Sequence, residues 1–187
     1  MNKKDSPQEK RKSFMELETP YFWTSTINSW NHLLKEDSYK QIIVQSLQWL
    51  CKRNLIAVYG FTIMDNHVHF IWEQLKMNGK EYPKNSFEKF TAHKFPEQLR
   101  ITGSAKLSRF EHRVIDRNYQ FWQRDPLAIE IVGSNAAIQI LNYIHNNPLQ
   151  DHWRLVTDSI LYKYSSANYY QTGFDEFNIL THYMERF

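Results

Sequence analysis

Cysteine, glycine, proline and long apolar runs are all scarce in this sequence. Only Cys51 of its 187 residues is a cysteine, which excludes an internal disulfide framework and is typical of a reducing compartment. Five glycines and six prolines leave little room for low-complexity sequence. No stretch approaches the roughly 20 apolar residues of a membrane span, and no apolar run follows the charged start. These absences predict a cytoplasmic protein with no signal peptide and no membrane partner.

The composition is that of one globular domain with a substantial core. Hydrophobic residues make up 42% of the chain and aromatic residues 16%. Residues 1–18 are polar and charged, and we expect a flexible leader there. Residues 19–172 then form the main domain, and residues 173–187 form a C-terminal tail.

Positive charge is concentrated in one quarter of the chain. The net charge is only +3, yet the segment 76–124 holds 11 Lys or Arg against 5 Asp or Glu. Such asymmetry indicates a polyanionic partner, although a charged helix face is often simply solvated. Binding through these cations would depend on salt concentration. Our candidates for phosphate contacts are Lys89, Lys94, Arg100, Arg109, Arg113 and Arg117.

Residue patterns predict an antiparallel α+β fold. Aromatic and β-branched residues predict strands at 21–28, 55–63, 67–73 and 119–124. Helical spacing predicts helices at 37–52, at 85–101 with an interruption near Pro96, and at 134–147. Asp65 and Asn66 suit the tight turn of a hairpin between the second and third strands. We therefore expect a ferredoxin-like sandwich of four or five strands, with helices on one face and a C-terminal extension.

Two histidines alternate along the third predicted strand. His67 and His69 point to one face of that strand, and Val68 and Phe70 point to the other. Two imidazoles so placed can chelate one divalent ion without distortion of the backbone. The alternative is that both are structural residues of a half-buried face.

The last long predicted helix carries a tyrosine and an amide one turn apart. At 100° per residue, Tyr143 and Asn147 lie opposite the apolar stripe of this helix. If the helix packs beside the histidine strand, Asn147 can supply a third oxygen ligand and Tyr143 a nucleophile for phosphoryl transfer. The alternatives are a surface tyrosine and an asparagine that caps the helix before Pro148. We expect the neighbouring His145 to be structural or to contact DNA.

Three segments together resemble the IS200-like single-tyrosine (Y1) transposases, and especially the REP-associated tyrosine transposases of the HUH endonuclease superfamily. These segments run from Ile63 to Phe70, from Tyr143 to Pro148 and from Tyr164 to Ala167. The resemblance implies a transposase that nicks and joins single-stranded DNA at hairpins, and leaves a 5′-phosphotyrosine and a free 3′-OH. It implies a nucleoid-associated protein that acts as a monomer or a homodimer.

The same resemblance assigns roles to four residues of the predicted domain. His67 and His69 would be the paired histidines that hold a divalent metal ion, Mg²⁺ or Mn²⁺. Asn147 would complete the metal site, and Tyr143 would be the nucleophile. The chain departs from the pattern at Asp65, where proline or serine is common, and at 149–153, where Leu-Gln-Asp-His-Trp replaces a run of small residues.

Two other functions remain open at the level of sequence. The first is a protein that binds DNA hairpins but has lost catalysis, which an intact His-x-His motif and tyrosine disfavour. The second is a metal-independent phosphodiesterase that uses histidines as acid and base. It would need a second histidine motif on a matching strand. The four candidates lie outside the predicted strands: His93, His112, His145 and His152.

Overall fold

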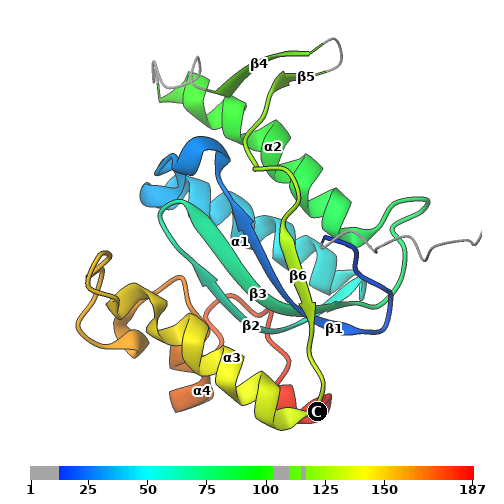
Figure 1. Ribbon diagram of the computed structural model, residues 1–187, viewed down its shortest axis with the longest axis vertical. Helices are drawn as coiled ribbons and strands as arrows, with labels where there is room; N and C mark the ends of the chain where they lie inside the picture. The colour runs from blue at the N-terminus through cyan, green and yellow to red at the C-terminus, as the bar shows by residue number, and fades with distance from the viewer. Residues whose placement is uncertain (1–12, 103–109, 115–116) are drawn as a thin grey trace, which may run out of the picture.

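An antiparallel sheet of four strands forms the centre of the molecule (Figure 1). The computed structural model describes residues 13–102, 110–114 and 117–187. The strands lie in the order β2-β3-β1-β6, and each pair of neighbours is antiparallel. Their bounds are β1 Pro20–Thr26, β2 Ile56–Ile63, β3 His67–Gln74 and β6 Leu127–Glu130. This arrangement confirms the predicted α+β class and its antiparallel sheet.

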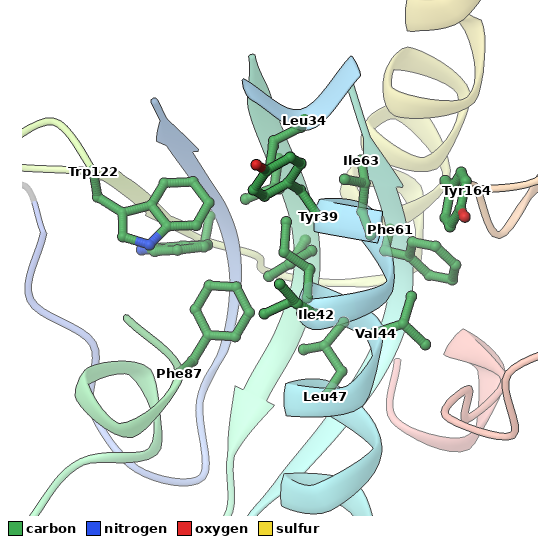
Figure 2. Packing of buried hydrophobic residues seen from close by; sticks show 14 of the residues in the cluster. Leu34, Tyr39, Ile42, Val44, Leu47, Phe61, Ile63, Phe87, Trp122 and Tyr164 are labelled. Carbon is green, nitrogen blue, oxygen red and sulfur yellow. The ribbon is translucent and has the colours of Figure 1, made fainter. Parts of the chain in front are cut away.

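Two helices, α1 (Asp37–Lys52) and α2 (Pro83–Ile101), cover one face of the sheet. Their apolar side chains meet the inward residues of the strands, and Figure 2 shows the α1 stripe between Phe87 on one side and Phe61 on the other. Trp23 and Phe70 stack in this core with ring centroids 5.5 Å apart. Beyond α2 lies a small second sheet of β4 (Glu111–Val114) and β5 (Arg117–Tyr119). No helix in the described part of the chain combines the length and the apolar character needed to cross a bilayer.

The opposite face of the sheet is covered by α3 (Ser134–Asn146), so helices lie on both faces where we expected one. The reason is that every residue of β3 is buried, which leaves apolar side chains on both of its faces. On the second face, Phe22 and Ile71 pack against Leu141 and Ile144 of α3. A short helix, α4 (Ala167–Thr172), lies near α3 (Figure 1).

Two predicted elements differ from the structure. The segment 119–124 does not form the fourth strand, because Phe121 and Trp122 are drawn into the α2 core and only Trp122 bridges to Ile27 beside β1. The strand that pairs with the free side of β1, opposite β3, is β6, a few residues later in the chain. Helix α2 also continues through Pro96 without a break. The buried residues Phe95 and Leu99 anchor the helix on both sides of the proline.

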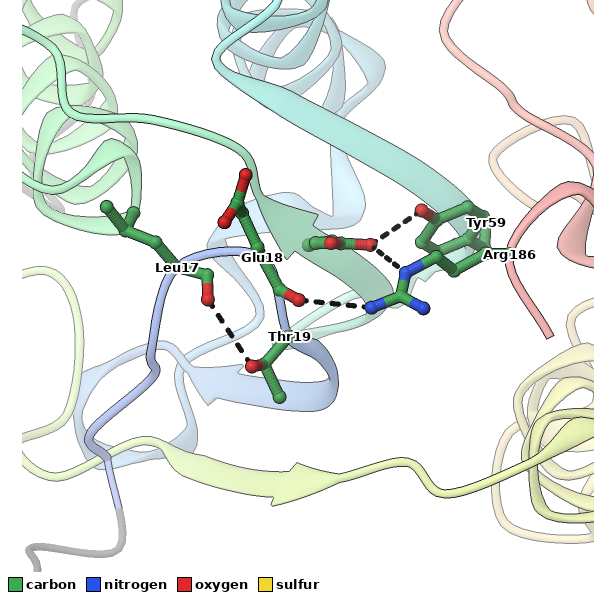
Figure 3. Close-up of polar contacts among 6 residues, drawn as sticks. Leu17, Glu18, Thr19, Tyr59 and Arg186 are labelled. Atoms are coloured by element: carbon green, nitrogen blue, oxygen red, sulfur yellow. Dashed lines mark hydrogen bonds and ion pairs between the residues drawn. The ribbon is translucent and has the colours of Figure 1, made fainter.

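The segments at the two ends of the main domain contact the sheet. In the segment 13–18, Met15 is 3% exposed and lies in the core. Near the C-terminus, the guanidinium of Arg186 donates to the buried carboxylate of Glu73 at 2.8 Å and to the carbonyl of Glu18 at 3.0 Å. Tyr59 donates to the same carboxylate, as Figure 3 shows. These contacts tie both ends of the described chain to β3.

Five short 3₁₀ helices complete the described fold, and the first two frame the start of β3. Their bounds are η1 Asn28–Trp30, η2 Leu33–Lys35, η4 Asn147–Leu149, η5 Ser159–Leu161 and η6 Tyr183–Glu185.

Candidate active site

His67 and His69 lie at the start of β3, on the face that α3 covers. Their Nε2 atoms are 3.1 Å apart, and the two residues are 9% and 4% exposed, respectively. Burial, followed by the repulsion of His152 and His32, lowers the pKa of His67 to about 4 against an opposing effect of Asp65. Burial, followed by the repulsion of His67, lowers the pKa of His69 to about 3. Both imidazoles are therefore neutral at neutral pH and able to act as ligands.

Asn66 fixes the ring of His67. The Asn66 amide nitrogen donates to the carbonyl of Trp30 at 3.4 Å, which turns its oxygen toward His67 Nδ1 at 2.7 Å. A carboxamide oxygen only accepts hydrogen bonds, so Nδ1 of His67 carries the proton. The consequence is a lone pair on Nε2 of His67, directed at His69.

Thr24 plays the same part for His69. Thr24 lies opposite His69 in the register of β1 and β3, and its hydroxyl is 2.7 Å from His69 Nδ1. On the other side of the ring, the amide nitrogen of Asn147 lies 3.2 Å from His69 Nε2. An amide donor in that place requires a lone pair on Nε2, so Nδ1 of His69 donates to Thr24.

Tyr143 lies beside this pair in the same chain. Its ring meets the ring of His69 edge to face, with centroids 5.5 Å apart. Phe22 supports both rings, since it stacks on His69 at 5.5 Å and meets Tyr143 at 6.0 Å. The tyrosine is 53% exposed, whereas Asn147 is buried at 6%. The phenol is therefore open to solvent on one side and next to the buried imidazoles on the other.

The C-terminal end of α3 is held on β2 by close packing and hydrogen bonds. The hydroxyl of Thr62 donates to the carbonyl of Ile144 at 2.9 Å. His145 lies 2.8 Å from the hydroxyl of Ser166, and burial lowers its pKa to about 4. Ser166 also accepts from the backbone N–H of Phe61 on β2 at 3.0 Å. The segment around Ser166 therefore joins the edge of the sheet to the helix that carries Tyr143, and His145 has a structural contact.

Comparison with known proteins finds a likeness in structure and none in sequence. No protein-family model matches the sequence, and no curated protein sequence matches it. Among solved structures, the chain is similar to a REP-associated tyrosine transposase bound to a REP hairpin, with a TM-score of 0.59 and 14% sequence identity. The match covers 91% of this chain and 90% of that chain. The two proteins share a fold.

Among the described residues, the predicted DNA contacts lie apart from the histidine pair. Lys89 and Lys94 are on α2, across the sheet from α3, and they form ion pairs with Glu81 and Glu97. Arg100 is exposed near the end of α2. Arg113 and Arg117 are in β4 and β5, and Arg109 is outside the described residues. The roles of these cations stay predictions.

Four further residues of the site were not predicted from the sequence. Asn66 was interpreted only as a turn residue, and Thr24 and Phe22 only as strand residues. Their contacts depend on the register of β1 against β3, for which the sequence holds no signal. Trp153 lies 5.7 Å from His67, centroid to centroid. The signal that could have identified it was the departure from the family pattern at 149–153.

Proposed function

We propose that this protein is a metal-dependent endonuclease and strand transferase for single-stranded DNA, with Tyr143 as its nucleophile. One observation carries the proposal: the Tyr143 ring lies 5.5 Å from His69, whose Nε2 is 3.1 Å from the Nε2 of His67. The shared fold with a REP-associated tyrosine transposase supports the same function. A phenol beside a pair of neutral imidazoles is an arrangement suited to phosphoryl transfer.

The side chains around the pair fit a divalent metal ion. The Nε2 atoms of His67 and His69 are 3.1 Å apart, each with a lone pair, and together would hold one divalent ion. The two lone pairs repel each other at that distance, and a cation between them removes the repulsion. Asn147, whose amide group lies 3.2 Å from His69 Nε2, would offer its oxygen as a third protein ligand. Mg²⁺ or Mn²⁺ held by these groups would supply a positive charge that polarises a phosphate oxygen.

The reaction of Tyr143 is a transesterification. Its phenolic oxygen attacks the phosphorus, the new O–P bond forms, and the bond from phosphorus to the 3′ oxygen breaks. The phenol loses its proton to solvent, which reaches the half-exposed side chain, and the leaving 3′ oxygen takes one up. The 5′-phosphotyrosine keeps the energy of the broken diester, so a second 3′-OH can attack it and complete strand transfer.

A DNA hairpin is the partner that we propose. The solved transposase with this fold is bound to a REP hairpin. The segment 76–124 of this chain has the excess of positive charge that contact with phosphates requires. Six cations of that segment are our candidates for the hairpin contacts: Lys89, Lys94, Arg100, Arg109, Arg113 and Arg117.

A covalent-adduct assay tests this function. The protein is mixed with Mn²⁺ and labelled hairpins that carry unpaired flanks, and adducts are resolved on a denaturing gel. We expect a labelled protein band from the wild type and from Tyr82→Phe, a control at the start of α2, and none from Tyr143→Phe or with EDTA. An adduct formed by Tyr143→Phe would refute the role of Tyr143. Hairpin binding by the wild type without any adduct would identify a binding protein that has lost catalysis.

A further inference from the structure

A loop with an exposed tryptophan, Trp30, contacts Asn66, the residue that precedes the histidine pair. Trp30, in the 3₁₀ helix that follows the mostly buried strand β1, is 63% exposed. Both Ser29 and Trp30 have left-handed backbone conformations, with φ values of 56° and 55°. Such a conformation costs on the order of 1 kcal/mol or more for a residue with a side chain. Backbone strain beside a candidate site indicates that the conformation of this loop, which exposes the Trp30 side chain, matters to function.

The strained loop is connected directly to the site. The carbonyl of Trp30 accepts from Asn66, which orients His67, so the backbone that exposes the indole also sets the histidine. Two residues later, His32 lies 5.6 Å from Trp153, whose ring lies 5.7 Å from His67. We call Trp30, His32, His152 and Trp153 the aromatic rim. Trp153 is half-buried, and the other three residues are exposed.

The aromatic rim and Tyr143 contact different members of the histidine pair. Tyr143 lies against His69 and Phe22, whereas Trp153 lies against His67. In phosphoryl transfer the attacking and leaving oxygens are roughly in line with phosphorus. A phosphate seated at the pair and attacked from the His69 side therefore directs its leaving 3′ oxygen toward the His67 side.

We infer that the aromatic rim binds the unpaired nucleotide whose 3′ oxygen leaves when Tyr143 attacks. This inference rests on the proposed function. Single-stranded nucleic acid is the occupant that the rim fits, because unpaired bases stack on exposed aromatic rings whatever their sequence. The neighbouring imidazoles of His32 and His152 offer hydrogen bonds to the sugar and phosphates. The rim retains the 3′-OH strand after cleavage, which keeps it available for rejoining.

Binding measurements on Tyr143→Phe, which cannot cleave, test the rim without any need for catalysis. The probes are a blunt DNA hairpin and the same hairpin with single-stranded thymidine extensions. Adding Trp30→Ala should weaken binding of the extended hairpin by about 5- to 150-fold, the effect of losing one base stack. Binding of the blunt hairpin should not change. Trp30→Phe should keep most of the affinity, and Trp49→Ala, which removes an exposed tryptophan on α1, should keep all of it. Equal affinities of Trp30→Ala and its parent for the extended hairpin would overturn the inference.

A second measurement identifies the nucleotide that the rim holds. In the oligonucleotide that the wild type cuts, 2-aminopurine replaces the base on either side of the scissile phosphate. We expect Tyr143→Phe to quench the probe on the 3′-OH side, and we expect Trp30→Ala to abolish that quenching. Quenching on the other side alone would overturn the inference even though the enzyme cleaves DNA. Failure of the wild type to form an adduct would instead reject the proposed function, while the hairpin measurements would still test whether the rim binds single strands.

Discussion

Gly60→Ala should displace the helix that carries Tyr143. A Cβ atom at position 60 would lie 2.6 Å from Leu141 Cδ2, and 3.4 Å from the Cδ1 atoms of Ile144 and Ile71. Carbon atoms pack at about 3.5–4.0 Å, so the Leu141 side chain, and α3 where that side chain cannot turn away, must move from β2 by about 1 Å. Overpacking of this kind costs about 1–3 kcal/mol. Each kcal/mol lowers the melting temperature of a chain of this size by about 2–4 °C.

The same displacement should slow DNA cleavage more than it impairs folding. A misplacement of about 1 Å at a reacting group can cost about 100-fold in rate. We therefore expect Gly60→Ala to form the adduct at Tyr143 up to about 100-fold more slowly, at a temperature where it is fully folded. Leu141→Ala makes room for the new methyl group, so the cost of Gly60→Ala should shrink in that background. Wild-type stability and rate in Gly60→Ala, or equal costs in both backgrounds, would show that α3 does not depend on this contact.

Two further predictions concern the buried histidines. Asn66→Leu should weaken Mn²⁺ binding, measured by calorimetry, by about 10- to 100-fold, because His67 loses the acceptor that fixes its tautomer. Asn66→Asp keeps an acceptor and should retain binding. Equal affinities of the wild type and both variants would contradict the role of Asn66 in orienting His67. With a chelator present, the free energy of unfolding should fall as the pH drops from 6.5 to about 4. The unfolded histidines bind protons in that range, while the folded pKa is about 4 for His67 and His145 and about 3 for His69. Each histidine contributes up to about 1.4 kcal/mol per pH unit to the slope of unfolding free energy against pH. Unfolding free energies from urea titrations should therefore fall less steeply with decreasing pH in His145→Gln. An unchanged dependence on pH would argue against the burial of His145.

Most elements of the fold could be predicted because they depend on local patterns. Helical spacing defined α1 at its observed bounds, and the turn at Asp65 and Asn66 joined β2 to β3 as expected. The second helical layer could not be predicted in this way. Periodicity identifies the apolar side of α3, but it does not say which face of the sheet that side covers. The prediction of a strand at 119–124 was wrong, because aromatic enrichment does not distinguish a strand from an irregular segment packed in a core. Phe121 of this segment packs against Phe95 of α2.

In the candidate site, too, local patterns identified residues, whereas contacts that depend on tertiary structure could not be predicted. Alternation along β3 put His67 and His69 on one face, and rotation along α3 put Tyr143 and Asn147 on one side; the structure brings these groups together. Their catalytic and metal-binding roles stay predictions. The orientation of the imidazoles could not be predicted from the sequence, because it depends on strand register and on the strained backbone of Trp30.

The most direct test of this account is to locate the covalent bond between protein and DNA. Wild-type protein is incubated with Mn²⁺ and a cleavable hairpin substrate, the attached DNA is digested with nuclease, and the peptides are sequenced by mass spectrometry. We predict a nucleotide linked through its 5′ phosphate to the phenolic oxygen of Tyr143. A nucleotide on any other residue, or DNA cleaved with no linkage to the protein, would contradict it.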